Sequence, residues 1–440
     1  MNPSKRKICQ VMALALSSVS ATAAMAAGPV VLGGGSSLVA PLMGSVSQPN
    51  TEIGLFGTSE ATFTYYLPDS GAGQNGFLSN VPSFFGSTVT GTVDFANSDG
   101  ALTTAQVTNY NNGTIGRNSG PLIQIPYVVT PITIPLVNAP AVTSATTPQT
   151  TPNQAHSIAL DDDDLCGIFS GKLTNWNQVK NPETGATYNV NSPITVLYRA
   201  DNSGTTELLT RHLAAVCTTA NTASGVTFVD SLTFANTSAF PSGVPSNFVS
   251  ATGSGGVRSA LLTIQSSSGS PAAVAYLSPA YTNTFLAPSS SSASSQLQVA
   301  SLFNARNSTY YAPTAANATM AMGSSSIASP TGTAAADPTQ WAPISGTNYT
   351  ALANPASGYP VSGMSQIILS QCYADANVTK AVLDFLYDHY TNATFASVVH
   401  GNGFDTVSPN LQTGIVADFL TANRNKLNIG NPTVCSGKGR

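Results

Sequence analysis

Charged side chains are scarce in this sequence. Only 8% of its 440 residues are Asp, Glu, Lys or Arg, against about 25% in an average soluble protein. The 15 basic and 19 acidic residues give a formal charge of −4. Because a nucleic-acid binder needs a basic surface, no nucleic acid is expected as a partner. Any anion that the protein binds must therefore be held by local dipoles and a few well-placed cations.

Long apolar runs are absent from the chain after its N-terminal segment. No later stretch approaches the roughly 18 apolar residues needed to span a membrane. At the N-terminus, the basic cluster Lys5–Lys7 precedes the apolar stretch Val11–Leu16 and then a run of small residues. This order is typical of a secretory signal peptide. We predict a signal peptide over residues 1–26, cleaved after Ala23 or Ala26. The mature protein should then be periplasmic or secreted, without stable membrane insertion.

Removal of this segment leaves 12 basic residues against 19 acidic ones, a formal charge of −7. Cys9 precedes the apolar segment, so it cannot become the lipidated first residue of a mature lipoprotein. The mature chain should therefore be acidic and carry no lipid anchor.

Cysteine and histidine are too few and too scattered to indicate a metal site. The chain has no CxxC pair and only four histidines, spread over the sequence, so zinc is not expected. Four cysteines follow the signal peptide, and an even number in an exported chain predicts two disulfides. Three pairings are open. We favour Cys166 with Cys217 and Cys372 with Cys435, because each bond closes a loop within one region.

The familiar catalytic and cofactor motifs are missing. There is no GxSxG elbow and no Walker lysine motif. GAGQNG at 71–76 matches the dinucleotide pattern GxGxxG, but Pro68 and Asp69 interrupt the preceding strand-like run, which weakens that interpretation. Asp161–Asp164 lacks the glycine and glutamate of a calcium loop and suits the first turn of a helix. No cofactor is predicted.

Apolar patterning predicts an α/β fold. Short apolar runs indicate strands at Val30–Leu32, Val93–Ala96, Leu122–Ile125, Ile132–Val137, Ile194–Tyr198 and Ala273–Leu277. Apolar residues at helical spacing indicate helices at Leu208–Val216, Val382–Tyr390 and Ile415–Leu420. More than 400 mature residues exceed the size of one core, so two domains are expected. About residues 286–340 are rich in Ser and Ala and indicate a loop-rich insertion.

Three segments share one design, in which a strand leads through a turn rich in Gly, Ser or Asp into a helix. They are VVLGGGSSLVAPL from Val30, VDFANSDGALTTAQV from Val93 and ITVLYRADNSGTTELLTRHL from Ile194. The N-terminus of a helix offers free N–H groups and a positive dipole end, which suit an oxyanion. Any one segment alone is explained by ordinary helix capping. Several such ends converging would form an anion site.

Taken in order, the motifs resemble the PstS-like phosphate-binding proteins of ABC uptake systems, and within them the DING branch. The resemblance covers essentially the mature chain. The four phosphate loops would be GGGSSLVAP from Gly33, PDSGAGQNGF from Pro68, VDFANSD from Val93 and YRADNSGTTE from Tyr198. The DING branch is indicated by LCGIFSGKLTNW from Leu165, SQCYA from Ser370 and the C-terminal LNIGNPTVCSGKGR, which also supports the favoured disulfide pairing.

The resemblance implies a set of phosphate contacts. They would be Ser37, Leu38, Ser70, Asp99, Arg199, Ser203, Gly204 and Thr205. Arg199 would offer a guanidinium fork to two phosphate oxygens, and Asp201 would orient that fork from behind. The serine and threonine hydroxyls and the backbone N–H groups of Leu38, Gly204 and Thr205 would complete the set of donors.

Asp99 would decide between anions. A carboxylate facing an anion is repulsive unless the ligand brings a proton to share, and phosphate near neutral pH has one whereas sulfate does not. An unpaired buried acceptor costs on the order of 1–3 kcal/mol, so Asp99 is predicted to penalise sulfate.

The sequence departs from the family pattern in two places. Val30-Val31-Leu32 stands where the DING branch has Asp-Ile-Asn, and Ser37-Leu38 stands where the first loop usually has Thr-Phe. Ser37 keeps a hydroxyl and Leu38 keeps its backbone N–H, so we expect binding to persist.

The fold that the resemblance implies is a type II periplasmic binding protein, with two α/β lobes joined by hinge crossover strands and a ligand cleft between them. Lobe 1 would comprise residues 27–124 and 275–440, and lobe 2 residues 125–274. The crossovers would lie near Leu122–Val137 and Ala273–Leu277.

The predicted function is high-affinity binding of inorganic phosphate by an exported, monomeric protein, for uptake or scavenging. An ABC permease is a candidate partner. Two alternatives stay open: a secreted phosphomonoesterase that uses the same pocket, and an extracellular interaction protein that has lost binding. Because hydrolysis needs an activated nucleophile or a metal, and the sequence indicates neither, an enzyme is not predicted.

Overall fold

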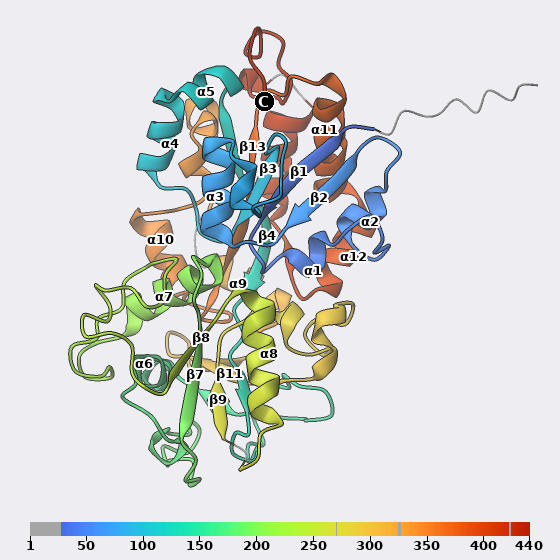
Figure 1. The fold of residues 1–440 in the computed structure, drawn as a ribbon. Coiled ribbons are helices and arrows are strands. Elements are labelled where there is room, and N and C mark those ends of the chain that lie inside the picture. Colours follow the sequence, from blue (N-terminus) through green and yellow to red (C-terminus); the bar gives the residue numbers. More distant parts are fainter. Residues whose placement is uncertain (1–27, 270, 324–326, 422–423) are drawn as a thin grey trace, which may run out of the picture.

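A computed structural model of the chain describes residues 28–269, 271–323, 327–421 and 424–440. The predicted signal peptide, 1–26, lies outside these described residues. The chain forms two α/β lobes, each around its own sheet, one above the other in Figure 1. Within the described ranges, no helix combines the length and apolar character needed to cross a membrane. The expected two-lobed α/β fold is confirmed.

Lobe 1 is built on a six-stranded mixed sheet. In spatial order its strands are β14 (Asp405–Thr406), β4 (Leu122–Pro131), β13 (Ser362–Ser370), β3 (Phe95–Ser98), β1 (Val30–Gly35) and β2 (Thr62–Tyr66). β1 runs parallel to both of its neighbours, β2 and β3, and β13 runs antiparallel to β3 and β4. β1, β2 and β3 therefore end at the same edge of the sheet.

Helices cover both faces of this sheet because its buried strands are apolar on both sides. Val31 of β1 packs in the cluster that contains Phe385, whereas the next residue, Leu32, packs with Phe77 on the opposite face. The helices of this lobe are α1 (Ala40–Met43), α2 (Glu52–Phe56), α3 (Ser70–Ser79), α4 (Thr104–Asn112), α5 (Thr114–Ser119), α9 (Ala315–Met322), α11 (Ala376–Thr391), α12 (Ala393–Gly401) and α13 (Pro409–Ile415).

Lobe 2 contains a five-stranded and a three-stranded sheet. The larger one has the order β10 (Gln298–Val299), β5 (Pro135–Val137), β9 (Ala272–Val274), β7 (Ile194–Arg199) and β8 (Phe248–Ala251), and the smaller one β12 (Thr309–Tyr311), β11 (Ser301–Asn304) and β6 (Ala159–Leu160). Its helices are α6 (Asp162–Ser170), α7 (Gly204–Val216), α8 (Gly253–Gln265) and α10 (Gly346–Ala353). β7 is parallel to β8 and β9, so β7 and β8 also end side by side.

The chain passes between the lobes at positions that differ from the expected boundaries. β4 pairs with β13 as far as Pro131, so lobe 2 begins near residue 132 instead of 125. After β9 the chain does not return at 275, because β10 pairs with β5 and β11 pairs with β6. Further along, α9 packs against β4 and β13 of the six-stranded sheet. Short-range patterning identifies a strand but does not say which sheet it joins.

The Ser- and Ala-rich insertion of about 286–340 is more ordered than expected. It supplies β10, β11, β12 and α9, besides short 3-10 turns. It therefore completes lobe 2 and then covers part of lobe 1.

Both favoured disulfides are confirmed. Cys166 in α6 joins Cys217 at the end of α7, and Cys372 after β13 joins Cys435 in the C-terminal segment. Each bond stays within one lobe, so neither restrains the movement of one lobe against the other.

Candidate functional site

Strand ends from the two lobes meet between them. The loops that follow β1, β2 and β3 come from lobe 1, and those that follow β7 and β8 come from lobe 2. The lobes touch here, since the N–H of Gly71 donates to the carbonyl oxygen of Asn202 over 2.9 Å. A Cβ atom on Gly204 would lie 2.6 Å from the Cβ of Asp99. The fold thus brings all four predicted loops together.

Arg199 ends β7 and is almost wholly buried, with 2% of its surface exposed. Its Nε donates to Asp201 Oδ1 over 2.8 Å, and Nη2 forms an ion pair with Asp201 Oδ2. Burial alone would lower the pKa of Arg199, but the hydrogen bonds and charge of Asp201 raise it. Burial would raise the pKa of Asp201, and Arg199 holds it below its usual range. The guanidinium is therefore charged, and its contacts with Asp201 fix its orientation.

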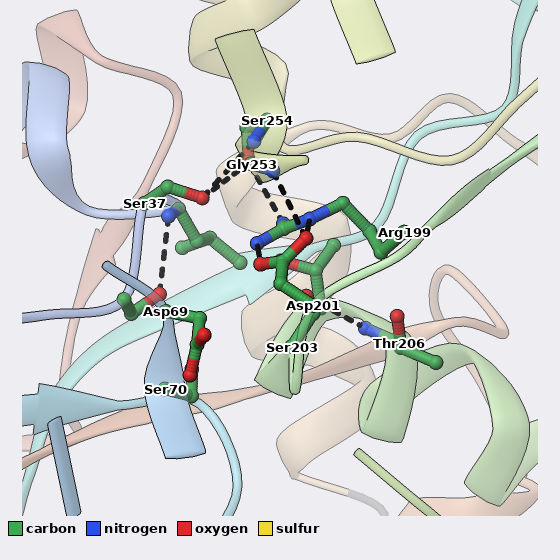
Figure 2. A network of polar contacts seen from close by, with 12 residues as sticks. Ser37, Asp69, Ser70, Arg199, Asp201, Ser203, Thr206, Gly253 and Ser254 are labelled. Atoms are coloured by element: carbon green, nitrogen blue, oxygen red, sulfur yellow. Dashed lines mark hydrogen bonds and ion pairs between the residues drawn. The ribbon is translucent and has the colours of Figure 1, made fainter. Parts of the chain in front are cut away.

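Ser37 and Arg199 are linked by hydrogen bonds to a third residue, Ser254, which was not among the predicted site residues. Ser254, at the start of α8, accepts from Arg199 Nη1 over 3.2 Å, and its Oγ lies 2.9 Å from Ser37 Oγ. The backbone N–H of Ser254 also donates to Ser37 Oγ over 3.1 Å. Figure 2 shows Ser37 and Arg199 converging on Ser254 from opposite sides.

Asp99 follows β3 and accepts hydrogen bonds from three hydroxyl groups. Ser36 Oγ donates to its Oδ2 over 2.7 Å, Ser365 Oγ to its Oδ1 over 2.8 Å, and Thr205 Oγ1 to Oδ2 over a longer 3.4 Å. Burial raises the pKa of Asp99, while these hydroxyls and the charge of Arg199 act in the opposite direction. Asp99 and Arg199 thus face the same junction, one as an acceptor and one as a donor.

Several buried backbone N–H groups around this junction have no protein acceptor among the described residues. They belong to Ser37 and Ser70 on lobe 1, and to Gly204 and Thr205 at the start of α7. The first N–H groups of a helix have no partner within the helix. Because buried N–H groups in native proteins pair with protein groups or with ordered water, this set can donate to an acceptor from outside the chain, such as water or an anion.

Three of the predicted donor residues also make hydrogen bonds within the protein. The N–H of Leu38 donates to Ser36 Oγ over 3.0 Å within its own loop. Ser203 Oγ accepts from the N–H of Thr206 over 3.3 Å and so caps α7 (Figure 2). Ser70 Oγ accepts from the N–H of Asp99 over 3.4 Å. In this arrangement Leu38 and Ser203 shape the loops that carry the other donors.

Two tyrosines that the sequence analysis did not select hold the first loop in place. Tyr65 donates to the carbonyl oxygen of Ser36 over 2.8 Å, and Tyr281 to that of Ser37 over 2.9 Å. No sequence motif marks them. Ser254 does have a signal, since TGSGG from Thr252 follows β8 in the same strand, turn and helix design as the recognised loops.

A metal has no obvious place in the parts of the chain that the structure describes. No cluster of three or more His, Cys, Asp or Glu side chains able to hold an ion occurs there. The junction instead offers hydroxyls, backbone N–H groups, one cation and one acceptor.

Comparison with known proteins identifies the family of this chain. The family model for the PBP superfamily domain matches residues 19–388. The chain belongs to the PBP superfamily, among the phosphate-binding proteins of DING type. It is 36% identical to a "Phosphate-binding protein" from an unknown prokaryotic organism, over 84% of this chain and 91% of that one. It is 35% identical to "Alkaline phosphatase L" of Pseudomonas aeruginosa, over 93% and 94%.

Solved structures of DING proteins have the same two-lobed fold. The high-affinity periplasmic phosphate-binding protein PfluDING, solved with bound phosphate, matches 93% of this chain and 99% of its own, with a TM-score of 0.72 and 32% identity. A human phosphate-binding apolipoprotein covers the same shares with a TM-score of 0.73 and 32% identity. The predicted family is thus confirmed.

Proposed function

We propose that this protein binds inorganic phosphate between its two lobes. The observation that carries the proposal is the set of buried N–H groups on Ser37, Ser70, Gly204 and Thr205 that lack protein acceptors in the described chain. Arg199 adds to them, because contacts with Asp201 and Ser254 occupy three of its five N–H donors and leave two. Such convergent donors suit a tetrahedral oxyanion.

Asp99 favours phosphate among such anions. With Arg199 countered by Asp201, an ionised Asp99 leaves this buried junction with a net negative charge. An anion therefore fits beside Asp99 only where a shared proton forms a hydrogen bond between the two. Monohydrogen phosphate brings a proton that it can donate to the Asp99 carboxylate, whereas sulfate brings none. The predicted contacts through Ser37, Ser70, Asp99, Arg199, Gly204 and Thr205 remain part of this proposal, with Leu38 and Ser203 shaping the loops.

The biological role in this proposal is that of an exported solute-binding protein. The N-terminal pattern of residues 1–26 supports export, and the binding function needs no second copy of the chain. Delivery of phosphate to an ABC permease fits this role, as does scavenging outside the cell.

Hydrolysis of phosphate esters is the competing function, because relatives named alkaline phosphatase L share about a third of the sequence. Within the described residues, the site hydroxyls of Ser36 and Thr205 donate to Asp99, and no histidine contacts a site hydroxyl. Binding without turnover is the function that this arrangement supports best.

Calorimetry separates these functions. Titration of the purified protein with phosphate should give saturable binding, and sulfate should bind on the order of 10- to 100-fold more weakly. Phosphate at 100 times Kd should stabilise the fold by about 2.7 kcal/mol, seen as a raised Tm. Steady release of phosphate from a model ester, beyond one equivalent per chain, would favour the phosphatase. Absence of both binding and turnover would favour an interaction protein.

A further inference from the structure

Ser254 occupies the point where the lobes and the guanidinium meet. It is fully buried at the start of α8 in lobe 2, and Ser37 follows β1 in lobe 1. Its Oγ contacts both Ser37 Oγ, at 2.9 Å, and Arg199 Nη1, at 3.2 Å, while its N–H contacts Ser37 Oγ at 3.1 Å. A single side chain thus links a cation and a hydroxyl on opposite sides of the junction.

The hydrogens of these groups can be assigned by counting donors and acceptors. A serine hydroxyl has one hydrogen and two lone pairs. Ser254 Oγ accepts from Arg199 Nη1, and Ser37 Oγ accepts from the N–H of Ser254. In the remaining Ser37–Ser254 contact either hydroxyl can donate. Either choice leaves one hydroxyl hydrogen without a protein acceptor among the described residues.

A bound anion beside Ser37 resolves this choice. If Ser254 donates to Ser37, both lone pairs of Ser37 Oγ are occupied, and the hydrogen of Ser37 is the one left over. That hydrogen can then donate to the anion, and every hydrogen in the chain of contacts is used. If Ser37 donates to Ser254 instead, Ser37 faces the anion with a lone pair, which is repulsive.

We propose that Ser254 is a positioning residue, which turns the Ser37 hydroxyl into an obligate donor toward the bound anion while it holds the Arg199 guanidinium. The inference rests on the proposed function, since the anion is the acceptor that fixes the direction. The network also crosses the lobes, so it exists only while they are in contact. Ser254 should therefore slow release of the anion more than it speeds capture.

The test compares Ser254→Ala with Ser259→Ala, an exposed serine on the same helix. Inorganic phosphate is the probe, with Kd from calorimetry and rates from stopped flow. Ser254→Ala should raise Kd about ten-fold, mostly through a faster dissociation rate, because a hydrogen bond to a charged group and an oriented donor are both lost. Ser259→Ala should bind like the unmodified protein. The Tm of both variants without phosphate checks that each is folded.

A double-mutant cycle identifies the positioning role, which a merely structural role would not reproduce. Part of the effect of Ser254→Ala should vanish in the Ser37→Ala background, because the hydroxyl that it orients is gone. Full additivity of the two substitutions, or an unchanged dissociation rate in Ser254→Ala, would overturn the inference. Failure of the unmodified protein to bind phosphate would instead overturn the proposed function, so the two failures are distinguishable.

Discussion

In the proposed function, a single side chain, Asp99, sets the selectivity of the site for phosphate. Its two carboxylate oxygens accept from Ser36, Ser365 and Thr205, which leaves room for a further donor, since a carboxylate offers about four lone-pair positions. Burial raises its pKa, so it takes up a proton at a higher pH than an ordinary aspartate. A protonated Asp99 can donate to an anion, whereas the ionised form can only accept.

The substitution Asp99→Asn should narrow the difference between phosphate and sulfate, because the amide can donate to either anion. The penalty on sulfate in the unmodified protein is on the order of 10- to 100-fold in Kd, from the 1–3 kcal/mol cost of an unpaired buried acceptor. Lowering the pH should act in the same direction, since protonation supplies the missing donor. Competition calorimetry with both anions over a pH series measures this, and sulfate binding that stays negligible in Asp99→Asn would contradict it.

At the scale of elements, the start of α7 must approach the loop after β3 very closely. A Cβ on Gly204 would lie 2.6 Å from both the Asp99 Cβ and the Gly100 nitrogen. Real Cβ contacts are not that short, so only glycine lets the N-terminus of α7 reach the site. The sequence analysis selected Gly204 as a donor; the structure gives it a second role in lobe contact.

The substitution Gly204→Ala should therefore prevent the close contact between the start of α7 and the loop after β3. Overpacking of about 1–3 kcal/mol at this contact predicts phosphate binding weaker by on the order of 10- to 100-fold. Gly255→Ala in α8 is the matched control, because its Cβ would have no atom within 4 Å and alanine favours a helix. Both Kd and the Tm without phosphate should be measured. Equal Kd for the two variants would show that the lobes tolerate the added methyl group.

At the scale of the whole molecule, the junction of the lobes extends into a cavity of about 520 Å³. Glu207 of α7 lines it, and a Cβ on Gly100 of lobe 1 would lie 2.1 Å from Glu207 Oε2. Burial, then the charges of Asp230 and Asp99, raise the pKa of Glu207 to about 8, against the opposing charge of Arg211. Gly100 and the charge of Asp99 are the parts of this environment that lobe 1 supplies, so contact between the lobes favours a protonated Glu207.

Phosphate binding should consequently take up a proton at Glu207. Between the ordinary pKa of a glutamate, about 4.3, and about 8, the closed form holds more protons than an open form with Glu207 in water. Affinity should fall as pH rises through this window and level off above it. Glu207→Gln should reduce the ratio of Kd at pH 8 to Kd at pH 5.

The ionisation of phosphate itself affects both proteins equally, so it cancels in this comparison. Glu60→Gln, on an exposed ion pair with Lys380, controls for the change of net charge. Calorimetry in buffers of different ionisation enthalpy counts the protons taken up. An identical pH profile for Glu207→Gln and the unmodified protein would show that the carboxyl group does not sense lobe contact.

Local sequence determined much of this protein. The strand, turn and helix motifs, the Arg199 and Asp201 pair, and the alternation of apolar residues all depend on neighbours a few positions apart. Such spacing fixes which side chains share a turn or a face. The α/β class and most loops of the site could therefore be predicted, and the favoured disulfides are confirmed.

Tertiary structure alone decided the rest. Ser254 lies 217 positions from Ser37, and Ser365 lies 266 positions from Asp99, so no local pattern connects them. The insertion joins lobe 2 because β10 and β11 pair with β5 and β6. Strand pairing and lobe contact depend on which distant surfaces fit together, and that fit appears only when the whole chain is folded.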